Sequence, residues 1–320
     1  ANDVELLVDA LAQEDVAEYA ELGLELFGED AVKPLVAVGR TAAPNARGAA
    51  ISMLPLVDRG AVPDAVAVLR DSLGDGSTDV VVAALRSLAT VGAAGDIRHV
   101  FEMSDRGDVH ILLAKNAALS SLAGRFPKVA RDLLKGLDPH SDAALSGCVL
   151  IEALGRLGLG ADADESFAEV AVAHRDSRVR RGAVEALATI ASDDAVRMVS
   201  FALADEEEQV ALAAIRALGR MRAIRPLAQL MTSSKNPVFV GAALRALGEA
   251  DDEVQLAHAS ALASSADYAL ASIAIETIGL SSADGREQAL AGALTHSDPA
   301  VVCLILSELV RLHGDRSREA

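Results

Sequence analysis

Histidine and cysteine are the residue types of this chain best suited to metal binding, nucleophilic attack or proton transfer. Such chemistry needs several of these side chains at short, fixed spacings, because they must converge on one atom. The seven histidines and two cysteines are instead scattered along 320 residues, and no His is followed by Glu. GxSxG and P-loop motifs are also absent from the sequence. The sequence therefore predicts no catalytic residues, no metal site and no cofactor.

The cysteines and several of the histidines have structural explanations instead. Cys148 and Cys303 fall within apolar segments far apart in the chain, so we predict buried, unreactive thiols and no disulfide. His140, His174 and His296 each lie within two residues of an Asp, in segments expected to be turns. We interpret these three histidines as turn residues.

Charge is the most distinctive polar property of the chain. It has 47 acidic and 29 basic residues, which gives a formal net charge of −18. This sign disfavours binding to nucleic acid, whose phosphates require a basic surface. Ten acidic residues and no basic one occur in the first 30 positions. This block is either a solvated end of the domain or a docking face for a basic partner.

The region from Arg175 to Arg225 is the richest in arginine, with nine Arg beside eight acidic residues. One interpretation is that these arginines pair within the chain with nearby carboxylates, namely Glu185, Asp193, Asp194 and Glu206 to Glu208. The other is a basic strip that binds carboxylates or phosphates of a partner. The sequence leaves both interpretations open.

Composition narrows the fold class. Hydrophobic residues make up 51% of the chain, yet aromatic residues only 2%, with no Trp. The apolar content is too high for a disordered chain, and β-sandwiches and barrels rely on aromatic and β-branched cores. The longest charge-free run, Val254 to Ala266, is shorter than the roughly 18 residues needed to span a membrane. No signal peptide is recognisable, so we expect a cytoplasmic protein with no membrane contact.

A repeat of about 31 residues runs through the chain. The helices of this repeat must position the charged side chains described above. The segment AIRALG at 214–219 recurs as ALRALG at 243–248 and as AIETIG at 274–279. Upstream the same shape appears at 183–188 and 150–155, and weaker copies start at 118, 84, 50 and 23. We call the first residue of each copy its anchor; the anchors are residues 23, 50, 84, 118, 150, 183, 214, 243, 274 and 305.

The sequence around the anchors predicts a pair of helices in each repeat. Seven residues before five consecutive anchors lie Asp176, Glu207, Asn236, Asp267 and Asp298, of which all but the Glu are favoured N-cap residues. Pro237 and Pro299 follow at the first helical position, where a missing N–H is tolerated. Glycines at 155, 219, 248 and 279 stand where the first helix should end. A second amphipathic segment follows, for example 194–204, 223–231 and 253–263.

This pattern resembles the HEAT-like repeats of the PBS-lyase type, over about residues 15–312. The resemblance implies an all-α fold, a right-handed superhelical α-solenoid of about ten HEAT-like helix-turn-helix repeats. We predict one domain over 1–320, with an N-terminal capping helix at 1–14, repeats at 15–312 and a frayed tail at 313–320. The turn at 158–162 lies in a long interval and is a predicted bend in the stack.

Two enzyme families with similar repeats help to limit the function. Deoxyhypusine-hydroxylase-like HEAT enzymes need paired His-Glu motifs for two irons, and the chain has no His-Glu pair. HEAT-like alkylpurine DNA glycosylases need a basic concave face and aromatic residues, and the chain has neither Trp nor a strongly basic stretch. We therefore expect no nucleic-acid partner.

In such solenoids the second helices line the concave side, and their outward polar residues are the candidate partner-binding groove. These residues are Arg98, Glu102, Arg131, Lys135, Arg197, Arg225, Gln229, Gln255 and His258. The mixture of charges suits a protein or peptide partner. We expect a non-catalytic protein-protein interaction scaffold that is not an enzyme. The alternative is a bilin lyase-like subunit of the E/F type, acting on a tetrapyrrole-bearing protein. The oligomeric state is not predicted.

Overall fold

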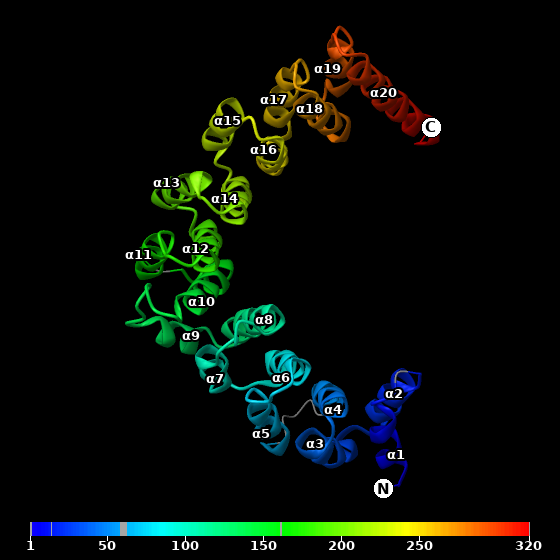
Figure 1. The fold of residues 1–320 in the computed structure, drawn as a ribbon, viewed down its shortest axis with the longest axis vertical. Coiled ribbons are helices and arrows are strands. Elements are labelled where there is room, and N and C mark those ends of the chain that lie inside the picture. The colour runs from blue at the N-terminus through cyan, green and yellow to red at the C-terminus, as the bar shows by residue number, and fades with distance from the viewer. Residues whose placement is uncertain (1, 14, 58–62, 161, 320) are drawn as a thin grey trace. The chain divides into compact units, whose positions relative to one another are not determined.

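The computed structural model describes residues 2–13, 15–57, 63–160 and 162–319, and these residues contain helices and no strand (Figure 1). The helices group by their contacts into two compact units, Ala1–Gly160 and Ala161–Ala320. The boundary falls within the turn at 158–162. Residues 1, 14, 161 and 320, at the predicted boundaries of cap, bend and tail, lie outside the described residues.

Unit 1 is built from alternating first and second helices of successive repeats. It starts with α1 (Asn2–Ala10), which packs against the first repeat as the predicted lone helix. The first helices are α2 (Ala17–Phe27), α4 (Pro44–Val57), α6 (Thr78–Val91), α8 (Val109–Arg125) and α10 (Ala144–Arg156). The second helices are α3 (Val32–Thr41, after the 3-10 turn η1, Gly28–Ala31), α5 (Pro63–Ser72), α7 (Asp96–Glu102) and α9 (Pro127–Leu134).

Unit 2 continues the same alternation. Its first helices are α12 (Ser177–Ile190), α14 (Glu208–Arg220), α16 (Pro237–Ala250), α18 (Tyr268–Leu280) and α20 (Pro299–Glu319). Its second helices are α11 (Asp162–Ala171), α13 (Asp193–Phe201, followed by the 3-10 turn η2, Ala202–Ala204), α15 (Ile224–Ser233), α17 (Asp252–Leu262) and α19 (Arg286–Ala293). The helix α20 runs on through the predicted tail. The predicted all-α repeat architecture is confirmed.

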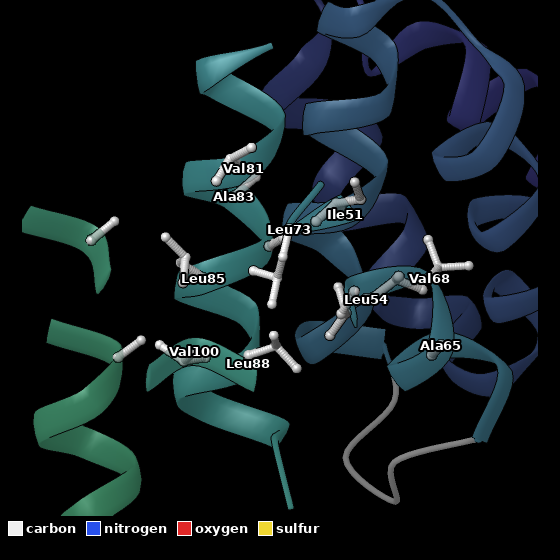
Figure 2. Packing of buried hydrophobic residues seen from close by; sticks show 14 of the residues in the cluster. Ile51, Leu54, Ala65, Val68, Leu73, Val81, Ala83, Leu85, Leu88 and Val100 are labelled. Carbon is white, nitrogen blue, oxygen red and sulfur yellow. The ribbon is translucent and has the colours of Figure 1, made fainter. Parts of the chain in front are cut away.

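The anchors form the buried contact between successive first helices. All the alanine anchors are fully buried: Ala50, Ala84, Ala118, Ala183, Ala214, Ala243 and Ala274. Each first helix within a unit packs on the first helix of the next repeat. Figure 2 shows one such layer, where Ile51, Leu54, Val68 and Leu88 from α4, α5 and α6 fill the interior. Small side chains at the anchors allow the helices to approach closely.

The predicted caps are confirmed in atomic detail. The side chains of Asp176, Asn236, Asp267 and Asp298 each accept a hydrogen bond from a backbone N–H in the following helical turn, at 2.8–2.9 Å. Glu207 occupies the same position without such a bond, as its longer side chain would predict. These bonds satisfy N–H groups that have no partner inside the helix, so they fix where each first helix begins.

The glycines near the helix ends have a different role from the one predicted. Gly219 lies within the last turn of α14, and neither it, Gly248 nor Gly279 adopts the positive φ of a left-handed cap. A Cβ at position 219 would lie 2.8 Å from the Cβ of Ala246 in α16. Glycine is therefore required there by the close approach of the next repeat and not by the end of the helix.

Polar contacts also connect neighbouring repeats. The hydroxyl of Ser87 donates to the carbonyl of Ile51 at 3.0 Å, one repeat earlier. In unit 2, the ring Nε2 of His296 lies 2.9 Å from the carbonyl oxygen of Ser265. The Nδ1 of His296 accepts from the backbone N–H of Asp298, which confirms it as a turn residue.

The two cysteines differ, and the prediction of a buried thiol is wrong for one of them. Cys148 is fully buried, and its burial raises the pKa of the thiol to about 12. Cys303 is exposed on α20. Within unit 2, the position two residues before an anchor faces the following repeat, as Gly241 does toward Ile273, and Cys303 occupies this position on α20. No helix follows α20 in the described chain to cover Cys303.

The close approach at Gly219 can be tested by adding one methyl group. Helix propensity alone favours Ala over Gly by about 0.5–1 kcal/mol. We nevertheless expect Gly219→Ala to lower the melting temperature, because overpacking costs about 1–3 kcal/mol. The matched control is Gly124→Ala in α8, where the new Cβ has no atom within 4 Å. It should leave the melting temperature equal or higher in thermal unfolding followed by circular dichroism. A stabilised Gly219→Ala variant would contradict the close packing.

Candidate functional site

The nine predicted groove residues lie on or directly beside second helices, as expected. In unit 1 they occupy α7 and α9, with Lys135 immediately after α9. In unit 2 they occupy α13, α15 and α17. Their role in binding stays a prediction.

Most of these side chains already have partners within the chain. Ion pairs within one helical segment engage three basic groups, at 2.6–3.2 Å: Arg98 with Glu102, Lys135 with Asp132, and Arg197 with Asp194. The guanidinium of Arg131 donates to the carbonyl of Leu159, and the amide of Gln255 donates to the carbonyl of Leu244 at 2.9 Å. Among the described residues, Arg225, Gln229 and His258 have no such contact, and the first two are exposed.

A second feature is a stretch of 40 residues, 209–248, that contains no Asp or Glu. It holds six basic residues: Arg216, Arg220, Arg222, Arg225, Lys235 and Arg245. The arginine-rich region from Arg175 to Arg225 includes the acidic turn at 205–208, so its average charge did not indicate the acid-free stretch that follows. Counting charges repeat by repeat would have found it. We call the exposed side chains of Arg216, Arg220, Arg222, Arg225 and Arg245 the arginine surface.

The packing of α14 against α16 brings these arginines together. Arg216 and Arg220 are separated by one helical turn on α14 and share a face. Arg245 occupies the same position in the next repeat as Arg216, two residues after the anchor. The contact between Gly219 and Ala246 marks a close approach of the two helices. Their sequence neighbours Arg220 and Arg245 therefore flank this seam, between the adjacent helices α14 and α16 of Figure 1.

Arginines of the preceding repeat behave differently. Arg178 pairs with Asp176 at 2.7 Å, and Arg180 pairs with Asp205 at 2.7 Å, so both arginines pair within the chain, although these two carboxylates are not among the predicted partners. Of the predicted partners, Glu206 lies 3.7 Å from Arg180. The members of the arginine surface have no side-chain ion pair or hydrogen bond within the described part of the chain. Arg220 lies in the last turn of α14, where the helix dipole favours a cation. Exposed guanidinium groups without carboxylate partners are suited to bind carboxylates or phosphates of another molecule.

The Arg180–Asp205 pair connects two repeats and is a structural element. Both side chains are nearly buried, at 11% and 10% exposure. Arg180 also donates to the carbonyl of His174 at 3.1 Å. The hydrogen bond from Arg180 lowers the pKa of the Asp205 carboxyl, since it stabilises the charged form.

Other site types find little support in the residues described. No group of three His, Cys, Asp or Glu among them could hold a metal ion. No described helix is long and apolar enough to cross a membrane. An open hollow lies between α17 and α19, beside the predicted groove residues of α17, and Glu253 and Asp284 are part of its lining.

Comparison with known families supports the repeat assignment. Residues 163–248 match a family described as HEAT repeats. This part of the chain is therefore built from HEAT-like repeats. The matched segment contains the helices α12 to α15 and most of α11 and α16, and with them the whole arginine surface. Among curated proteins, no sequence matches this HEAT-like chain.

Solved structures show the same solenoid fold. A chain of the structure in which Kap95p binds RanGDP is 12% identical, with a TM-score of 0.57, over 95% of this chain and 50% of that one. Importin beta, crystallised in ammonium sulfate, is 13% identical, with a TM-score of 0.52, over 97% and 51%. The HEAT-like chain thus spans about half the length of both. At these identities the likeness shows the fold alone.

A phycocyanin lyase complex of CpcE and CpcF from Nostoc is also similar in part. It is 18% identical, with a TM-score of 0.39, over 77% of this chain and 92% of that one. A score this low does not show that the repeats are arranged alike, so it carries no conclusion about activity.

The buried pair of Arg180 with Asp205 can be tested against Arg181, the exposed arginine next to it in sequence. We expect Arg180→Met to lower the free energy of unfolding by about 2–3 kcal/mol, somewhat less than the loss for a fully buried pair. Arg181→Met removes an exposed arginine next in sequence and should change it by less than about 0.5 kcal/mol. Chemical denaturation of both variants measures the difference. Equal stability of the two variants would contradict the structural role of Arg180.

The same pair predicts a pH dependence. The pKa of Asp205 is lowered in the folded state, so its contribution to stability is present above the ordinary value of 3.8. This contribution is lost as the pH falls through the lowered folded value. The stability difference between wild type and Arg180→Met should therefore shrink in acid. A difference that stays constant from neutral pH to below the folded pKa would show that the carboxylate is not the partner.

Proposed function

We propose that this HEAT-like protein is a non-catalytic scaffold that binds an acidic segment of a partner protein through the arginine surface of α14–α16. The observation that carries this proposal is the set of exposed arginines without a partner among the described residues, on the 40-residue stretch 209–248 that contains no carboxylate side chain. Solenoids present extended rigid surfaces of this kind, and little ordering of the scaffold is needed on binding.

The charge around this surface limits the partner to a short footprint. The acidic turn Glu206–Glu208 precedes the stretch, and Glu249, Asp251 and Asp252 follow it. Arg216 and Arg245 stand on neighbouring helices, whose axes are typically about 8–10 Å apart. An extended peptide rises about 3.3 Å per residue. Acidic residues about three positions apart would therefore meet the two arginines, and a longer acidic run would meet repulsion at both borders.

A protein segment fits this surface better than a nucleic acid does. Proteins that bind single strands stack the bases on aromatic side chains along a continuous basic groove. Here aromatic residues make up 2% of the chain and the net charge is −18. A phosphate backbone longer than two repeats would therefore run onto acidic residues.

The proposal contains no chemical step. The alternative, a lyase-like subunit acting on a tetrapyrrole-bearing protein, has a direct test. Incubation of the HEAT-like protein with a bilin and its apoprotein should produce no transfer and no change in the absorbance of the bilin. Transfer of the bilin would overturn the scaffold assignment.

Charge reversal tests the binding surface. The probe is a fluorescein-labelled peptide of glutamates, followed by fluorescence anisotropy at low salt. We expect Arg216→Glu combined with Arg245→Glu to weaken its binding by about tenfold or more, which corresponds to about 1.4 kcal/mol. The same double variant should lose partner proteins that wild type recovers from a lysate of the source organism.

The matched control is Arg86→Glu. Arg86 is exposed on α6 and also stands two residues after an anchor, but outside the acid-free stretch. Its reversal should leave the affinity nearly unchanged. Equal binding by wild type and the double variant would contradict the arginine surface. Tighter binding of an oligo-dT of equal charge than of the peptide would identify a nucleic-acid site instead.

A further inference from the structure

The first helix of the first repeat carries an apolar stripe that the fold does not bury. Ala20 and Leu24 of α2 face the core and are buried. Tyr19, Leu22 and Leu26 are 74%, 57% and 89% exposed. Their spacing of three and four residues places them on one face of the helix, turned away from the core. We call these three residues the α2 stripe.

Exposed apolar side chains are concentrated in this part of the chain. Among the described residues, six of the eighteen exposed large apolar side chains lie within the first 27 positions, namely Leu6, Val16, Tyr19, Leu22, Leu26 and Phe27. Single exposed apolar residues are ordinary on a protein surface, whereas a continuous stripe is typical of a docking surface.

A row of carboxylates runs beside the stripe. Glu18, Glu21 and Glu25 have the same spacing on α2, and all three are exposed. They form no ion pair among the described residues, and the first basic residue in the sequence is Lys33. The helix thus presents an apolar line and an acidic line next to each other. Such a surface is complementary to a helix that carries apolar residues on one side and cations beside them.

We propose that the α2 stripe binds a basic amphipathic helix of a partner protein. The apolar residues of the partner pack on Tyr19, Leu22 and Leu26, and its Lys or Arg side chains pair with the adjacent glutamates. The 11 residues of α2 extend over about 16 Å, which matches three turns of a partner helix. Three turns present apolar residues at i, i+3 or i+4, and i+7.

Charge also argues against a second copy of the chain in this place. A symmetric contact through the stripe would bring the two glutamate rows together, and like charges at an interface oppose association. A basic partner avoids this repulsion, and its cations are attracted by the glutamate row. This proposal goes beyond the scaffold function above, because the stripe belongs to unit 1, the arginine surface belongs to unit 2, and the two surfaces select opposite charges.

The test uses the absence of tryptophan from the chain. The probe is a helical peptide of Leu and Lys with one Trp on its apolar face, added to the full chain. We expect a saturable blue shift of the Trp emission as the face becomes buried. Leu22→Ser combined with Leu26→Ser should weaken the affinity by about tenfold or more. Both residues are exposed, so circular dichroism should show an unchanged fold.

Matched controls separate the stripe from general acidity. Val109→Ser with Leu113→Ser removes an exposed apolar pair from α8, which carries no glutamate row, and should leave binding unchanged. Glu21→Lys with Glu25→Lys should weaken binding, and a Leu/Glu peptide should not bind. The Arg216→Glu, Arg245→Glu variant should bind the Leu/Lys peptide like wild type. The proposal for the α2 stripe and the proposal for the arginine surface can therefore fail independently of each other.

Three outcomes would overturn the proposal. The first is equal binding of the Leu/Lys and Leu/Glu peptides, which would show that charge does not select the partner. The second is unchanged binding by the Leu22→Ser, Leu26→Ser variant. The third is a dimer in sedimentation analysis that this variant dissociates, which would make a second copy of the chain the occupant.

Discussion

Close packing between successive first helices is the constraint on which the rest of the structure depends. A single helix pair cannot bury its own apolar face, so each repeat is stable only against its neighbours. Fully buried alanines at the anchors, and Gly219 against Ala246, hold these layers thin. Layers of this thickness have little room for large rings, which explains how a chain with 51% hydrophobic residues contains only 2% aromatic ones.

This packing also determines which polar groups are used for structure. Near the seams between repeats, side chains such as those of Arg180 and Ser87 find partners one repeat away. At the outer surface of two other first helices, α14 and α16, the side chains of Arg216 and Arg245 find no partner among the described residues. Because each repeat contacts mainly its neighbours, the outer surface can change from one repeat to the next with little effect on the fold. The acidic α2 region and the acid-free stretch 209–248 are therefore compatible with one repeat pattern.

Local signals made most of the fold predictable. The period, the N-caps at Asp176, Asn236 and Asp267, and the buried anchors all follow from short-range rules of helix formation and periodicity, and the structure confirms them. The candidate site was less predictable. Eight of the nine groove residues lie on second helices, and Lys135 lies directly after one. Arg98, Lys135 and Arg197 pair with residues three or four positions away, a spacing that the sequence shows. The sequence could not show that Arg131 donates to the carbonyl of Leu159 and Gln255 to that of Leu244, because these contacts depend on how the segments pack.

By itself, then, the sequence determined the repeat, its helix pairs and the charge of each repeat, because these depend on neighbours along the chain. The tertiary structure alone decided between residues that look equivalent in sequence. Arg180 is paired and Arg181 exposed, and Cys148 is buried while Cys303 is not. Gly219 is required by the adjacent helix and not by a turn. For Arg180 and Gly219 the deciding contact comes from the next repeat, about thirty residues away, which no local pattern can report.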